Sequence, residues 1–195
     1  MLAFGMIIPV LPGLVVKLQG GDVTTGAATF GLFGAVFALM QFIFAPVLGA
    51  LSDRFGRRPV ILLSNLGLGL DFIVMALAPT VALLFVGRVI SGITSSSFTT
   101  AQAYIADVTP PDKRAARFGM LGVAFGIGFI IGPAVGGLLG TIDLRAPFWA
   151  AAALSFANFG YGFFILPESL PPERRSPFQP RSCSPSRPTA SMCMT

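Results

Sequence analysis

Long apolar stretches alternate with short polar segments along most of this chain. A helix that crosses a hydrocarbon core needs about 20 apolar residues. Stretches of about that length occupy residues 27–48, 60–78, 81–106, 118–140 and 147–166. A further apolar stretch, residues 1–16, supplies only about 24 Å of helix, less than a ~30 Å core. The pattern predicts an all-α integral membrane protein whose six transmembrane helices form a bundle over residues 1–168.

The short first stretch has a competing interpretation, a cleaved signal peptide. Such a peptide carries a basic N-terminal region and a small-residue cleavage site. Residues 1–16 have neither feature. We therefore interpret them as a shortened first span, with a turn or more of helix missing in front.

The polar segment 49–59, Gly-Ala-Leu-Ser-Asp-Arg-Phe-Gly-Arg-Arg-Pro, separates the second and third spans. A short segment with three arginines is expected on the cytoplasmic side, because positive residues near span ends resist translocation. Gly49 is expected where two helices approach closely, and Asp53 where a carboxylate accepts N–H groups at the start of the next helix. The arginines of this segment, Arg54, Arg57 and Arg58, are long enough to reach carboxylates or lipid phosphates. A simpler interpretation is a loop that only sets the topology.

Composition excludes a soluble domain. Only 11% of the 195 residues are charged and 54% are hydrophobic, whereas soluble domains carry about 25% charged residues. The chain has no histidine, and its two cysteines lie in the polar tail. We therefore expect no zinc site, no structural disulfide and no enzyme activity. Residues 169–195, rich in Pro, Ser and Arg, are expected to form a disordered cytoplasmic tail, a truncated linker.

The distribution of basic residues predicts the orientation. They gather in the segments that six spans place on one side, with Lys17 and Arg145 on the other. This bias explains the net charge of +5 better than nucleic-acid binding does. We expect a multi-pass protein of the cell inner (plasma) membrane with both termini in the cytoplasm.

Two charged residues, Asp71 and Arg88, lie inside apolar stretches. Counted from their helix ends at 1.5 Å per residue, their depths coincide in a ~30 Å core. An unpaired charge there costs at least ~2.5 kcal/mol on insertion scales, so we expect the two side chains to face each other or share a polar cavity. Such a pair either holds the hairpin together or, as the functional alternative, exchanges protons at Asp71.

Glycines dominate the stretch 118–140. Gly-x-x-x-Gly spacing recurs there and lets another helix approach to backbone contact. The longest such pattern, Gly-x-x-x-Gly-Pro-x-x-Gly-Gly, is formed by Gly128, Gly132, Pro133, Gly136 and Gly137.

Three of these patterns resemble signatures of the major facilitator superfamily. Segment 49–59 resembles its motif A, Arg-Val-Ile-Ser-Gly at 88–92 its motif B, and residues 128–137 its antiporter motif C. Connecting phrases such as Ala-Leu-Met-Gln-Phe-Ile-Phe-Ala-Pro at 38–46 are similar to its drug:proton antiporters of the tetracycline-efflux (TetA-like) branch. The gating residues that motif A implies are Gly49, Asp53, Arg54, Gly56, Arg57 and Arg58.

The resemblance implies a proton-driven drug exporter with two six-helix halves, each built from two inverted three-helix repeats around a central cavity. Its energy source would be the proton gradient, without a cofactor, and its partners the lipid bilayer and a small amphiphilic drug. We expect Asp53 and Arg57 to meet Asp107, closing a latch among helices two, four and five that favours the outward-open state. The candidate residues of the substrate cavity are Gln41, Ser91, Thr94 and Ser95.

The resemblance covers residues 1–178 and one half of such a transporter. The acidic residue that the family carries in its first helix is absent. We therefore expect a truncated half that works with a second six-helix half or as a homodimer. The alternative is a half-length membrane protein that transports nothing and acts only through helix association.

Overall fold

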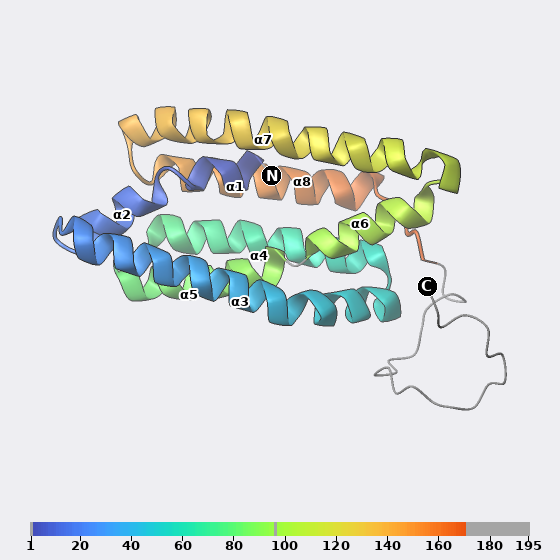
Figure 1. Ribbon diagram of the computed structural model, residues 1–195, viewed down its shortest axis with the longest axis horizontal. Coiled ribbons are helices and arrows are strands. Elements are labelled where there is room, and N and C mark those ends of the chain that lie inside the picture. Colours follow the sequence, from blue (N-terminus) through green and yellow to red (C-terminus); the bar gives the residue numbers. More distant parts are fainter. Residues whose placement is uncertain (1, 96, 171–195) are drawn as a thin grey trace, which may run out of the picture.

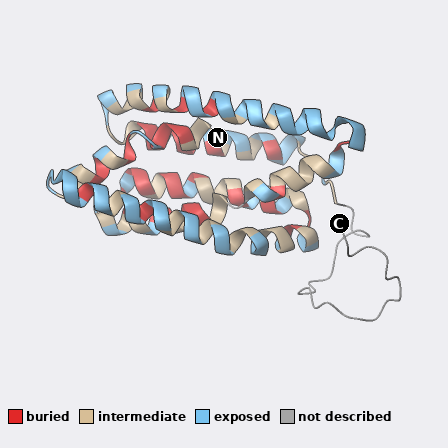
Figure 2. Ribbon diagram, in the orientation of Figure 1, coloured by how far each residue is buried: buried red, intermediate tan, exposed pale blue. Residues whose placement is uncertain are grey.

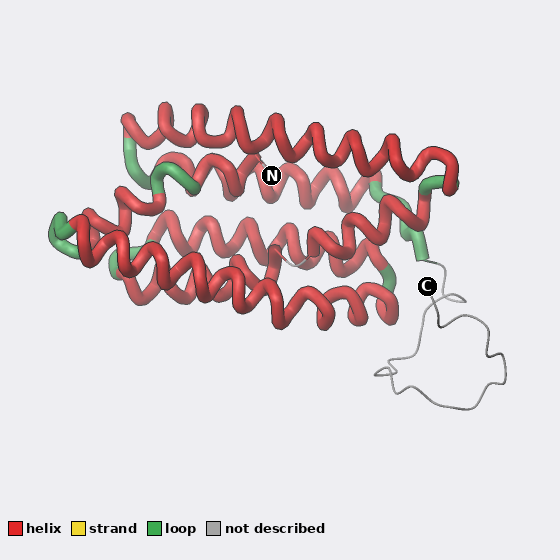
Figure 3. The backbone as a smooth tube through the Cα atoms, in the orientation of Figure 1, coloured by secondary structure: helices red, strands yellow, loops and turns green. Residues whose placement is uncertain are grey.

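The computed structural model describes residues 2–95 and 97–170, and every regular element in these ranges is a helix. This confirms the all-α prediction. Short turns join the helices, which run side by side along the long axis (Figures 1 and 3). The long helices are α3 (Val23–Phe55), α4 (Arg57–Leu77), α5 (Val81–Ser95), α6 (Ser97–Val108), α7 (Arg114–Ile142) and α8 (Ala146–Ile165).

Five spans in the described ranges are long and apolar enough to cross a membrane, with α5 and α6 counted together as Val81–Val108. The predicted first span is not one continuous helix. It consists of α1 (Leu2–Ile7) and α2 (Leu11–Leu18), separated by a turn. The prolines explain the break, because Pro9 lies in the turn and Pro12 in the first turn of α2, where a missing N–H does no harm.

The predicted loop 49–59 is almost entirely helical. Helix α3 continues to Phe55 and α4 begins at Arg57, so one residue, Gly56, turns the chain. Its φ of 108° and ψ of 155° lie in a region that is essentially restricted to glycine. The chain therefore reverses direction at one glycine, and the motif A side chains project from helix ends.

Burial is uneven across the bundle (Figure 2). Within the most apolar 18 residues of each span, the buried share is 44% for α4, 6% for α3 and 11% for the span that contains α7. The core is formed by buried side chains of the α1–α2 segment, α3, α4, α5 and α8. Its largest members include Phe33, Phe72, Met75, Leu84 and Phe148. Helices α3 and α7 thus present most of their apolar surface outward.

The N-terminus of α3 is capped by Asp22. Its carboxylate accepts hydrogen bonds from the Thr25 hydroxyl and from the backbone N–H groups of Thr24 and Thr25. These bonds, the Thr25 hydroxyl first, hold the pKa of Asp22 below its usual value. The cap is therefore present above the ordinary pKa of an aspartate and is lost as the pH falls through the lowered pKa.

Candidate functional site

Arg57 ties together helix ends at one end of the bundle. Its guanidinium lies 2.7 Å from Asp53 at the end of α3 and 3.1 Å from Asp107 near the end of α6. It also donates to the Ser52 hydroxyl over 2.8 Å, and that hydroxyl donates to the carbonyl of Gly49 over 2.7 Å. The structure thus brings together Asp53, Arg57 and Asp107, which we call the latch.

The latch differs from the prediction in two ways: in the helices that contribute residues to it and in the role of Asp53. The fifth span, α7, contributes no residue to it, whereas the end of α8 lies close by. Asp53 does not cap α4, because it lies in the last turn of α3 and its carboxylate pairs with Arg57. The acceptor for the backbone N–H of Arg57 is instead Glu168, at 2.9 Å. No local pattern signalled this carboxylate, since it lies 111 residues further along the chain.

The other motif A side chains lie around the latch. Arg58 donates to the carbonyl of Phe163 over 2.6 Å and lies over its ring, so it fastens α4 to α8. Arg54 is exposed and lies over the ring of Phe55. A Cβ atom at Gly49 would meet nothing within 4 Å among the described residues, so the expected close helix approach there is wrong.

Asp71 and Arg88 are both buried between α4 and α5, with 1% and 7% of their surfaces exposed. The prediction was that they face each other or share a polar cavity. They lie near each other without a direct ion pair, because no Arg88 nitrogen comes within 4 Å of the carboxylate. Asp71 instead accepts a hydrogen bond from Ser91, and Arg88 donates to the sulfur of Met75 over 3.1 Å. Oδ1 of Asp71 and Nε of Arg88 have no hydrogen-bond partner in the described part of the chain. The four side chains form a buried cluster, the α4–α5 cluster.

The α4–α5 cluster borders a small cavity through Arg88. The cavity measures about 140 Å³, and its other walls are apolar side chains of α1, α2 and α3. They include Phe4, Ile7, Leu11, Phe33 and Phe37. Arg88 therefore lies between Asp71 and the cavity beside α1 and α2.

Two of the four candidate drug contacts, Ser91 and Thr94, make hydrogen bonds within the bundle. Ser91 is buried with Asp71, while the Thr94 hydroxyl bonds the carbonyl of Ile90 and its methyl group packs toward Gly67. The cavity beside Arg88 is not lined by Gln41, Ser91, Thr94 or Ser95. Their contact with substrate stays a prediction.

The glycines of α7 pack against α1. A Cβ atom at Gly132 would lie 2.8 Å from Cα of Gly5, and one at Gly5 would lie 2.8 Å from the carbonyl oxygen of Gly128. A Cβ atom at Gly136 would lie closer still to the backbone of Met6. Gly137 has nothing within 4 Å of such an atom in the described ranges. Three of the four motif C glycines therefore form a helix crossing at backbone contact.

Known proteins share this sequence and fold. The sequence profile of the Major Facilitator Superfamily matches residues 1–192. The chain is 49% identical over 171 residues to the class C tetracycline resistance protein of Escherichia coli, covering 88% of this chain and 43% of that protein. It is 44% identical to the class B protein of Escherichia coli, covering 81% of this chain and 39% of that one.

A solved structure agrees with these relatives. The crystal structure of the human organic anion transporter MFSD10 (TETRAN) superposes with a TM-score of 0.81 at 30% identity, over 91% of this chain and 46% of that one. The chain thus spans less than half the length of the relatives it matches. Its relatives are membrane transporters and not enzymes. The chain is a multi-pass membrane protein that belongs to the major facilitator superfamily.

Proposed function

We propose that this chain forms one six-helix half of a proton-driven exporter of a small amphiphilic drug, of the kind that tetracyclines represent. The names of the tetracycline resistance proteins support the substrate class. The observation that carries the coupling is the burial of Asp71, the only acidic side chain in residues 2–95 and 97–170 that is buried. An ionisable group inside a membrane bundle marks an ion or proton path by default.

The α4–α5 cluster supplies the proton site. Asp71 keeps one carboxylate oxygen unbonded and Arg88 one unbonded nitrogen, so both groups have room to change partners. A proton on Asp71 removes its charge and with it the attraction to Arg88, which then moves toward the cavity it borders. Because Ser91 and Met75 connect the cluster to both helices, gain or loss of the proton biases the packing of α4 against α5. No cofactor takes part, since the proton gradient supplies the energy.

The latch gates access at the inner end. Its charge-assisted hydrogen bonds join α3, α4 and α6 and stabilise the conformation in which this end is closed. The α3–α4 and α6–α7 turns lie at the same end of the bundle (Figure 1). Arg54, Arg57, Arg58, Lys113, Arg114 and Arg117 lie at or next to these turns, which supports a cytoplasmic location for this end. The inner (plasma) membrane is part of the same proposal.

The outward faces of α3 and α7 supply the contact with a second six-helix half or a second copy. Glycines on these faces, among them Gly31, Gly122 and Gly126, have nothing within 4 Å of a Cβ position in the described ranges. Small residues are typical of helix faces that another transmembrane helix approaches closely, and no helix of this bundle approaches these glycines. The same observation favours the second candidate function, a membrane protein that only associates with others through these helices.

One experiment separates the two functions. The purified chain is reconstituted in proteoliposomes, alone and with a separately expressed second half, and tetracycline movement is followed while a pH gradient is imposed. Coupled movement of drug and protons, together with cross-links between two chains, is the expected result. Cross-links without any gradient-driven drug movement in either sample would leave association as the function.

A further inference from the structure

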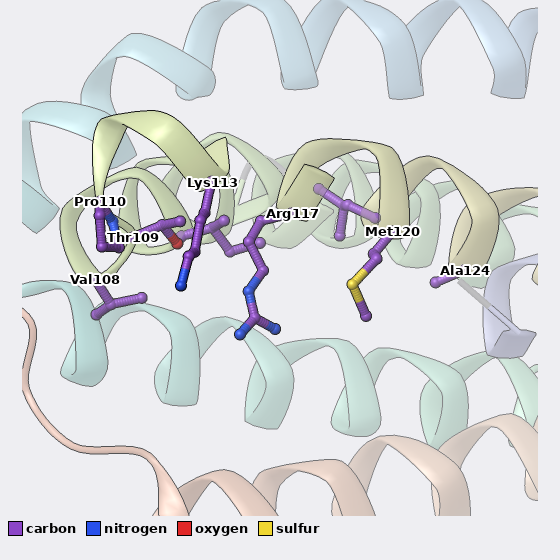
Figure 4. Close-up of a pocket in the computed structure, with 9 residues that line it drawn as sticks. Val108, Thr109, Pro110, Lys113, Arg117, Met120 and Ala124 are labelled. Carbon is purple, nitrogen blue, oxygen red and sulfur yellow. The ribbon is translucent and has the colours of Figure 1, made fainter. Parts of the chain in front are cut away.

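A groove of about 500 Å³ lies between α6 and α7 at the end of the bundle that carries the latch (Figure 4). Val108, Thr109 and Pro110 form one wall, at the turn after α6. Lys113, the residue just before α7, and Arg117, in the first turn of α7, reach into the space, and Figure 4 shows both side chains directed to the same side. The latch and the α4–α5 cluster use none of these residues.

The α7 wall changes character along the helix. Lys113 is the N-cap of α7 and Arg117 lies one turn further on, and both line the groove. The groove wall continues with the apolar side chains of Met120, Leu121 and Ala124. From Lys113 to Ala124 the helix rises ~16 Å, about half the thickness of a hydrocarbon core. The groove thus presents two cations at the level where the span begins and an apolar wall that runs to about mid-membrane.

The two cations are available to an external anion. No carboxylate of the described residues lies within 4 Å of either Lys113 or Arg117, since both ion pairs there involve Arg57. The neighbouring Arg114 is already committed, because it donates to the carbonyl of Thr109 over 3.2 Å and so holds the turn. Charge and shape together match an amphiphilic anion with a compact head and a long tail.

We propose that this groove binds one anionic phospholipid, with its phosphate between Lys113 and Arg117 and an acyl chain along Met120, Leu121 and Ala124. Basic pockets between transmembrane helices on the cytoplasmic side bind such head groups. The bilayer supplies this ligand at the depth where the cations lie. The proposal needs only that the chain spans a membrane and does not depend on the transport activity.

A single tryptophan in the groove tests the proposal. Trp149, the only tryptophan of the chain, is replaced in the background variant Trp149→Phe, and Met120→Trp supplies the reporter. The full chain is placed in phosphatidylcholine nanodiscs that contain, at equal mole fraction, phosphatidylglycerol or phosphatidylcholine with brominated chains. We expect stronger quenching by the brominated phosphatidylglycerol.

Charge-removing variants identify the residues responsible. Arg117→Gln is expected to lower the preference for phosphatidylglycerol about fivefold, and Lys113→Gln by a similar factor. Arg54→Gln is the matched control, because it also removes one exposed arginine at the same end of the bundle. Circular dichroism of each variant checks that its helices are intact.

Three outcomes would overturn the proposal. Equal quenching by both brominated lipids would show that the groove has no charge preference. Weak quenching by both would show that another chain covers the groove. Loss of the phosphatidylglycerol preference in inorganic phosphate at the same ionic strength would show that the cations bind free phosphate rather than a lipid.

Discussion

Arg57 shows what motif A can and cannot predict at the scale of a residue. The sequence predicted that Arg57 and Asp107 would lie near each other, because a count of spans puts both at one membrane face. It did not predict Ser52 or Glu168 as partners. Which hydroxyl or carboxylate completes a helix end depends on side-chain packing, and the distance between Arg57 and Glu168 along the chain carries no local signal.

The latch leads to a prediction for Asp107→Asn. This change removes one of the two carboxylates that pair with Arg57, whose side chain is only 13% exposed. Because Asp107 itself is partly exposed, we expect the free energy of unfolding to fall by about 1 kcal/mol, and drug movement to slow. Asp112→Asn is the control, since Asp112 is exposed and its replacement should change stability by less than about 0.5 kcal/mol. Thermal unfolding in detergent measures both, and equal shifts would argue against the latch.

At the scale of the element, the glycine spacing of α7 predicted a close helix approach but not the partner. A pattern on one helix does not specify which neighbour it meets, and here the neighbour is α1, a helix of only six residues. The broken first span was likewise outside the reach of a hydropathy pattern. Residues 1–16 are apolar throughout, and the break depends on the local chemistry of Pro9 and Pro12.

The α1–α7 crossing leads to a prediction for Gly132→Ala. The added Cβ would meet the backbone of Gly5 and Met6, which cannot rotate away as a side chain can, so the two helices must separate. We expect a loss of about 1–3 kcal/mol in the free energy of unfolding. Gly126→Ala on the open face of the same helix should be neutral or stabilising by up to ~1 kcal/mol. Thermal unfolding of the two variants side by side measures the difference, and a larger loss for Gly126→Ala would contradict the crossing.

At the scale of the whole molecule, the sequence predicted the all-helical class and the family correctly, because long apolar runs and motif spelling are local properties. It did not predict how the buried charges are arranged. Equal depth predicted that Asp71 and Arg88 face each other or share a polar cavity. Both lie in one buried cluster, where Ser91 bonds the carboxylate and Met75 accepts from the guanidinium. Depth along a helix follows from counting residues, but the side that each residue faces depends on the packing of α4 against α5.

The proposed transport function depends on Asp71, which would carry the proton that is exchanged for drug. Its most direct test is to add tetracycline to the purified chain, alone or with its second half, in weakly buffered detergent solution. Proton release and drug binding are then measured together for the parent, for Asp71→Asn and for the exposed control Asp112→Asn. We expect the parent and Asp112→Asn to release protons on binding, whereas Asp71→Asn should bind drug and release none. Undiminished proton release by Asp71→Asn would contradict the proposal.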